Sequence, residues 1–202
     1  MTKFKTLVLI ALLSVLLAAC GGKVNTKVNT GNVMGGKYEN QSLGLCFKMP
    51  PNSLPFTLSA SYKAMKFSKR ADQLIDINNS AQEILIGITQ SNHNIIVSVV
   101  NPYKIDGAFP KSVKNLVFKE LRDRVTALKV ESTAITTEKI NQNEYYRFSA
   151  DYTVERANFT SYAHYYFIKH KDVILLFQVA NAPDVGRSSL QSLLKDVNLN
   201  CF

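Results

Sequence analysis

The sequence predicts an α+β domain in which a mainly antiparallel sheet carries one long helix. Between Tyr146 and Val154, apolar side chains alternate with polar ones, which is the period of a strand with one buried face. From residue 112 to 128, apolar residues recur every three or four positions and form one stripe of a helix. Strand patterns at 159–168 and 173–180 follow after short polar turns, and short turns of this kind join antiparallel neighbours.

The first half of the chain contains one clear strand pattern before residue 80. Alternating Leu43, Leu45, Phe47 and Met49 predict a strand at 43–49, which Pro50-Pro51 ends. The segment from 54 to 79 has a mixed pattern, in which Ser68 suits the N-cap of a short helix running to Ile75.

A hairpin is expected next. Isoleucines at 84–88 and a β-branched run at 95–100 predict its two strands. Ser80 and Glu83 also fit a capping box, so a helix at 81–88 is the alternative. We favour the hairpin because Gly87 and the isoleucines disfavour a helix.

The second half is more regular. Pro110 and Ser112 mark the start of the long helix, and Leu190, Leu193 and Leu194 form the apolar stripe of a shorter one. The predicted elements, in chain order, are a helix at 112–128, strands at 132–139, 146–154, 159–168 and 173–180, a helix at 188–195 and a strand at 197–199.

An apolar run near the N-terminus predicts a signal peptide at residues 1–19. Lys3 and Lys5 precede Leu7–Leu17, a run shorter than the roughly 20 apolar residues of a membrane-spanning helix. The run ends in Leu17-Ala18-Ala19-Cys20, which resembles the lipobox of bacterial lipoprotein precursors. The resemblance implies cleavage after Ala19 and membrane anchoring by acyl chains on Cys20. A plain secretory signal and a signal anchor are the alternatives.

The residue after Cys20 indicates which membrane to expect. In Gram-negative lipoproteins, retention in the inner membrane usually needs Asp at this position, where the chain has Gly21. By this analogy we expect an outer-membrane lipoprotein that faces the periplasm, with a Gram-positive surface lipoprotein as the alternative.

The mature chain divides into two parts. Residues 20–36 contain KVNT in tandem between glycine pairs, and we expect a lipidated cysteine followed by a flexible tether. Residues 37–202 are expected to form a single domain.

The chain is basic. Loss of Lys3 and Lys5 with the signal peptide lowers the formal net charge from +9 to +7, and the basic residues are spread along the sequence. Such a charge suits nucleic acid or an anionic membrane. Because we expect a membrane-tethered protein, we expect no nucleic-acid partner; a solvated basic surface without a partner is the simpler alternative.

With Cys20 lipidated, two cysteines remain. In an oxidising compartment Cys46 and Cys201 are expected to form a disulfide that joins the first strand of the domain to the end of the chain. Two buried thiols that act as small apolar side chains are the alternative.

No motif for catalysis or cofactor binding follows. His93, His164 and His170 lack the spacing of metal ligands, which is two apart on a strand or three to four apart on a helix. The nucleophile elbow, the zinc-protease motif and the phosphate-binding glycine loop are missing from the sequence. We therefore expect a non-enzymatic protein without catalytic residues, metal or cofactor; an enzyme with scattered catalytic residues is the weaker alternative.

Tyrosines gather in the predicted meander. Tyr162, His164 and Tyr166 share one face of the strand at 159–168. If a helix covers this face, the three side chains are part of the core. If it does not, they form an exposed patch of the kind enriched in protein interfaces, and they are our candidate interaction patch.

The start of the domain carries a family resemblance. Residues 38–50, Tyr-Glu-Asn-Gln-Ser-Leu-Gly-Leu-Cys-Phe-Lys-Met-Pro, resemble the Y-x-N-x-x-x-G-(apolar)-x-F-x-(apolar)-P opening of PsbP-like domains, a superfamily that includes the DcrB-type envelope lipoproteins. The long helix and the aromatic meander resemble the rest of such a domain. The resemblance implies an α/β/α sandwich, with a mainly antiparallel sheet of about six strands and helices on both faces. It implies no catalytic residues, and members generally act as accessory factors that bind other proteins.

Three functions follow as hypotheses. The first is a lipid-anchored, non-enzymatic binding or accessory module for another envelope protein. The second is a small-molecule or lipid-binding lipoprotein with a cavity between helix 112–128 and the sheet. The third is a hydrolase with scattered catalytic residues. Partner, ligand and oligomeric state do not follow from the sequence.

Overall fold

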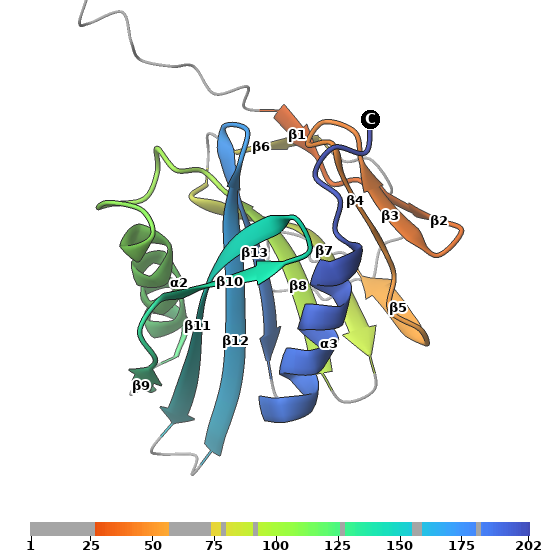
Figure 1. Ribbon diagram of the computed structural model, residues 1–202. Coiled ribbons are helices and arrows are strands. Elements are labelled where there is room, and N and C mark those ends of the chain that lie inside the picture. The colour runs from red at the N-terminus through yellow and green to blue at the C-terminus, as the bar shows by residue number, and fades with distance from the viewer. Residues whose placement is uncertain are drawn as a thin grey trace, which may run out of the picture.

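The computed structural model describes residues 27–56, 74–77, 80–90, 93–125, 128–154, 159–180 and 183–202. Its largest unit is an eight-stranded antiparallel sheet with the order β10-β11-β12-β13-β8-β7-β5, and β9 pairs with β11 on the same edge as β10 (Figure 1). The strands of this sheet are β5 (Ser53–Phe56), β7 (Gln82–Gln90), β8 (His93–Val100), β9 (Leu128–Ser132), β10 (Thr136–Ile140), β11 (Asn143–Val154), β12 (Phe159–His170) and β13 (Val173–Ala180).

Two small sheets and two helices complete the described part of the chain. They are the three-stranded sheet β2 (Asn32–Met34), β3 (Lys37–Asn40) and β4 (Leu45–Lys48), the pair β1 (Lys27–Asn29) and β6 (Leu74–Asp76), and the helices α2 (Lys111–Arg124) and α3 (Pro183–Asp196).

The alternation along the central strands divides the core into two clusters. On one face, Val113 and Val117 of α2 pack with Phe148, Phe167 and Leu176 of the sheet. The other face is covered jointly by α3 and the three-stranded sheet. There the buried side chains include Leu190 and Leu194 of α3, Tyr38 and Phe47 of the small sheet, and Phe177 of β13.

The predicted α/β/α sandwich is therefore wrong. The main sheet has eight strands, not about six, and the described residues form only two helices, each a single 14-residue element. Much of the layer beside α3 is β-structure, because Tyr38, Leu45 and Phe47 present an apolar side of the three-stranded sheet to the core. The fold is mostly antiparallel β-sheet.

Strands occur earlier in the chain than predicted. Strands β1 and β2 lie within residues 20–36, which were expected to be a flexible tether. Val28 is buried in the core, and β1 pairs with β6 far along the chain. A polar repeat without aromatic residues gives no local signal for such pairing, because the partner strand is distant in sequence.

Other predicted elements compare closely with the structure. The hairpin is confirmed, because β7 and β8 pair over their full length and the alternative helix at 81–88 does not form. The long helix ends at Arg124 rather than 128, where Val125 takes an extended conformation and residues 128–132 form β9. The predicted helix at 68–75 lies mostly outside the described residues, and its last positions belong to β6.

Candidate functional site

The candidate interaction patch is not exposed. Tyr162, His164 and Tyr166 do share one face of β12, but His164 retains 4 % and Tyr166 only 1 % of its accessible surface. Only Tyr162 is half-buried. The patch predicted from the sequence is therefore wrong as a binding surface. The alternative, a face covered by a helix, describes it, because Tyr166 is buried in one cluster with Leu190 and Leu194 of α3.

Hydrogen bonds and ion pairs through Glu138 link Tyr166 to α3. Its hydroxyl donates to Glu138 Oε2 at 3.1 Å, and Gln191 of α3 donates to Glu138 Oε1 at 2.6 Å. Arg147 Nε lies 2.8 Å from the same carboxylate, and Arg187 lies 3.7 Å from it. Burial raises the pKa of Tyr166. Together these groups form a bridge between α3 and the sheet edge.

His164 belongs to a hydroxyl–imidazole pair within the sheet. Its Nδ1 lies 2.7 Å from Ser149 Oγ, and the ring of Tyr162 packs edge-on against the imidazole with centroids 4.8 Å apart. A serine beside a histidine is the arrangement of an activated nucleophile. Here, however, both side chains are buried, which suits mutual hydrogen bonding better than attack on a substrate.

The other two histidines lie elsewhere. His93 is buried at the start of β8, where burial lowers its pKa, and His170 Nε2 lies 2.5 Å from the carbonyl oxygen of Leu43. The ranges that the structure describes contain no group of three His, Cys, Asp or Glu side chains that could hold a metal ion. In those same ranges, neither helix is long and apolar enough to cross a membrane.

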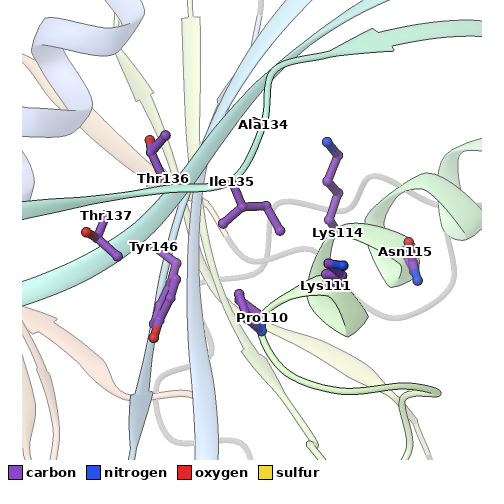
Figure 2. Close-up of a pocket in the computed structure, with 9 residues that line it drawn as sticks. All are labelled: Pro110, Lys111, Lys114, Asn115, Ala134, Ile135, Thr136, Thr137 and Tyr146. Carbon is purple, nitrogen blue, oxygen red and sulfur yellow. The ribbon is translucent and has the colours of Figure 1, made fainter.

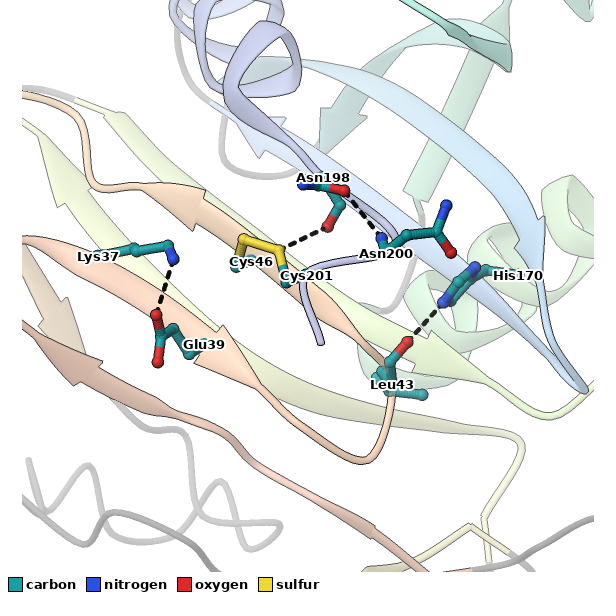
Figure 3. Close-up of a disulfide and its surroundings, with 8 residues drawn as sticks. All are labelled: Lys37, Glu39, Leu43, Cys46, His170, Asn198, Asn200 and Cys201. Carbon is teal, nitrogen blue, oxygen red and sulfur yellow. Dashed lines mark hydrogen bonds and ion pairs between the residues drawn. A yellow bond between two sulfur atoms is a disulfide. The ribbon is translucent and has the colours of Figure 1, made fainter.

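The structure joins Cys46 and Cys201 in a disulfide, the pairing expected from the sequence (Figure 3). The two Cα atoms are 6.0 Å apart, within the usual range for a disulfide. Cys46 and Asn198 exchange two backbone hydrogen bonds, of 3.0 and 2.9 Å, and the Cys201 amide donates to the Gly44 carbonyl at 3.0 Å. The bond therefore reinforces a contact between β4 and the C-terminal segment. Cys20, the predicted lipidation site, lies outside the described residues.

The candidate functional site is an open groove of about 790 Å³ between α2 and the edge of the main sheet (Figure 2). Lys111, Lys114 and Asn115 line the groove from α2. Thr137 and Tyr146, which pair across β10 and β11, line it from the sheet, and Thr136 contributes at the edge of β10. The remaining lining residues are Pro110, Ala134 and Ile135.

Two lysines give one wall of the groove its charge. The first turn of α2 is fully described, and it contains Lys111 and Lys114 but no acidic side chain. Lys114 Nζ donates to the Thr133 carbonyl at 2.7 Å and lies about 5.5 Å from the ring centroids of Phe118 and Phe148. Burial lowers the pKa of Lys114. These contacts hold one ammonium group in place, whereas Lys111 is exposed.

The edge strand β10 forms the opposite wall of the groove. β10 is the last strand on the main path of the sheet, and Thr136 and Thr137 are exposed on it. Tyr146 packs edge-on against Phe109, with ring centroids 4.8 Å apart. The lining, all of it within the described part of the chain, has hydroxyl, amide and ammonium groups but no carboxylate, imidazole or thiol. Such a surface offers charge and hydrogen bonds to a bound anion or polypeptide.

One hypothesis from the sequence placed a cavity between helix 112–128 and the sheet, but the sequence did not indicate the residues that line this groove. Lys111 and Lys114 follow a predicted helix start, which was the available signal, but their partners on β10 and β11 come more than 20 residues later. Only the packing of α2 against the sheet brings the two sets together.

Comparisons with known proteins bear on the fold alone. No protein-family model matches the chain, and no curated protein matches its sequence. Among solved structures, the chain is similar to the solution structure of cyanobacterial PsbP (CyanoP) from Synechocystis sp. PCC 6803. The TM-score is 0.57 at 11% sequence identity, over 90% of this chain and 97% of that one. The chain therefore has a PsbP-like fold.

Proposed function

We propose that this protein is a bacterial envelope lipoprotein, anchored through Cys20, which acts as a non-enzymatic binding or accessory module for another envelope protein. The DcrB-type likeness within the PsbP-like superfamily is part of this proposal. The lipobox-like Leu17-Ala18-Ala19-Cys20 supports the anchor, and the Cys46–Cys201 disulfide supports an oxidising compartment. Gly21 after the lipidated cysteine favours the outer membrane and the periplasmic side.

The groove between α2 and β10 carries the binding part of the proposal. Its two lysines suit carboxylate groups, and its strand edge and threonine hydroxyls suit the backbone of an extended segment. A partner segment with acidic side chains, lying along the groove, would use both walls. The groove replaces the buried tyrosines as the proposed partner site.

Site-specific photocrosslinking tests this proposal. A photoreactive residue is placed at Thr137, inside the groove, in the full-length protein expressed in its native cells. Position 129 is the matched control, because Lys129 is exposed on β9 outside the groove. We expect Thr137 to capture one envelope protein that the control does not capture. Lys111→Glu in the same chain should reduce the yield about ten-fold, because an attractive charge contact with the partner becomes repulsive.

Crosslinking at both positions to the same set of abundant proteins would contradict a specific partner site. So would an unchanged yield with Lys111→Glu, because the lysine would then play no part in recognition.

A small molecule is the second candidate occupant. The volume of about 790 Å³ lies within the range of small-molecule pockets. Native mass spectrometry of the purified protein distinguishes a small molecule from a protein partner. An additional bound mass that is absent from Lys111→Glu would favour a small molecule. Absence of such a mass, together with a protein crosslinked at Thr137, would favour a partner.

The anchor is tested separately. Mass spectrometry of the mature N-terminal peptide should show acyl chains on Cys20, and Cys20→Ser should move the protein from the membrane fraction to the soluble fraction. An unmodified Cys20 in the mature protein would overturn the anchor but leave the groove as a binding site.

A further inference from the structure

The N-terminal chain enters the domain at one end of the main sheet. β1 begins at Lys27, and the Asn29 amide donates to Ser42 Oγ at 3.2 Å in the turn between β3 and β4. Lys171, in the turn between β12 and β13, donates to the Ser42 carbonyl at 3.3 Å. β1 therefore lies beside two hairpin turns through Asn29, its last residue, as the upper part of Figure 1 shows.

Two further segments reach the same end. The Cys201 amide bonds the Gly44 carbonyl, which brings Phe202 to the β3–β4 turn. Val100, the last residue of β8, pairs with Ile174 near the start of β13, so the loop at 101–109 leaves the sheet beside the β12–β13 turn. We call this set the anchor end: Lys27, residues 42–44, 101–109, 169–172 and 201–202.

The anchor end combines exposed aromatic rings with cations. Tyr103 is 66% and Phe202 64% exposed, which is unusual for large side chains in this molecule. Four lysines are exposed beside them, against two exposed acidic residues, Asp106 and Asp172; the lysines are Lys27, Lys104, Lys169 and Lys171. Aromatic rings and lysines are the side chains that proteins place at an anionic lipid interface.

The short segment between Cys20 and β1 indicates that the anchor end faces the membrane. Six residues lie between Cys20 and Lys27, and the seven steps along the chain, at 3.3–3.6 Å each at most, give a reach of about 25 Å. The twelve residues of β12 alone extend over roughly 40 Å. A lipid on Cys20 therefore keeps the anchor end, and not the far end of the sheet, close to the membrane.

We infer that the anchor end docks on the anionic lipid headgroups of the membrane that holds Cys20, with Tyr103 and Phe202 at the headgroup level and the lysines against phosphate. The inference rests on the lipidation in the proposed function. Docking orients the domain relative to the membrane.

Hydroxyl-radical footprinting of the lipidated protein tests the docking. The mature protein is reconstituted into vesicles containing about one-third phosphatidylglycerol, or into vesicles of phosphatidylcholine alone. Oxidation of each residue is then read by mass spectrometry. We expect Tyr103 and Phe202 to be oxidised about five-fold more slowly on the anionic vesicles, because lipid excludes the reagent there. Met34 and Leu54, both 72% exposed and away from the anchor end, are the internal controls and should not change.

A charge-matched pair of variants isolates the lysines. Lys104→Glu/Lys171→Glu should abolish the protection, whereas Lys119→Glu/Lys129→Glu changes the net charge equally at exposed sites elsewhere and should retain it. Equal oxidation of Tyr103 and Phe202 on both kinds of vesicle would overturn the docking and leave the lipid anchor intact. An unmodified Cys20 in the starting material would overturn the anchor and, with it, the docking.

Discussion

At the scale of single residues, the core beneath α2 contains polar groups that bond each other. The hydroxyls of Tyr152 and Tyr165 lie 2.5 Å apart, inside the same cluster as Phe148 and Phe167. A buried hydroxyl costs stability unless it finds a partner, and each tyrosine supplies the partner of the other. The pair therefore allows two large rings to fill the core without an unsatisfied oxygen.

Tyr165→Phe should destabilise the protein by about 1–2 kcal/mol, because it removes the hydrogen-bond partner of a buried Tyr152 hydroxyl. The double variant Tyr152→Phe/Tyr165→Phe should lose less stability than the sum of the two single variants. In each single variant one buried hydroxyl is left without its bonding partner, whereas the double variant has neither hydroxyl. Urea unfolding of the four proteins gives the comparison. Strict additivity would show that the two hydroxyls do not depend on each other.

Burial of tyrosines in both core clusters predicts a loss of stability in alkali. Burial raises the pKa of Tyr145 and of Tyr152 to about 12, from the ordinary value of 10.0. Folding therefore favours the neutral phenols, so their contribution is complete below pH 10 and is lost as the pH rises from about 10 to about 12. Each contributes roughly 2–3 kcal/mol. The free energy of unfolding, measured by urea at several pH values in this window, should fall less steeply in Tyr145→Phe; an identical slope would contradict the assignment.

At the scale of elements, the edge strand β5 is held to the sheet by an aromatic ring over a glycine. Phe56 pairs with Gly87 of β7, and the ring of Phe56 occupies the space where a Cβ of residue 87 would lie. Glycine in a strand weakens it, and a ring from the neighbouring strand restores the lost packing. The glycine that disfavoured a helix at 81–88 thus has a packing role in the sheet.

Gly87→Ala should displace the Phe56 ring and loosen β5, with a cost of about 1–3 kcal/mol for the overpacking. Hydrogen exchange of the β5 amides should accelerate more than that of the central strands. Adding Phe56→Leu, which provides room for the new methyl group, should recover part of the loss. No effect of Gly87→Ala on β5 would show that the ring is not what holds this edge.

At the scale of the whole molecule, one covalent bond links the beginning and end of the domain. The Cys46–Cys201 disulfide closes a loop of 155 residues and lies where β4 meets the segment after α3. A loop of this length corresponds to roughly 5 kcal/mol in the chain-entropy account, with native disulfides commonly contributing about 2–5 kcal/mol.

Cys46→Ser/Cys201→Ser should therefore lower the free energy of unfolding by about 2–5 kcal/mol, and a reducing agent should do the same to the unaltered protein. The measurement is urea unfolding with and without reductant, in which the variant should no longer respond. Equal stability of oxidised and reduced protein would show that the bond adds nothing to the contacts of Asn198 with β4.

The PsbP-like fold occurs here at 11% identity to its structural neighbour. Apolar patterning and turns specify such a fold with little dependence on particular residues, and binding sites are added by different side chains in each protein. The charged wall of the groove and the anchor end are properties of this chain and do not follow from the fold.

The sequence by itself determined the elements that local periodicity encodes, namely the strands, helices and turns of the second half of the chain. The alternation at 146–154, the helical stripe from Val113 to Val117 and the turns of the meander all predicted elements that the structure contains. The lone pair of cysteines predicted the disulfide in the same way, from a small number of alternatives.

Only the tertiary structure decided what depends on partners distant in sequence. The pairing of β1 with β6, the coverage of Tyr166 by α3 and the groove between Lys111 and Thr137 each join segments more than 20 residues apart. Periodicity shows that a strand has an apolar face, but not whether a helix, a second sheet or water covers it. That choice is made by the packing of the whole chain, because burial is a property of the assembled molecule and not of any single segment.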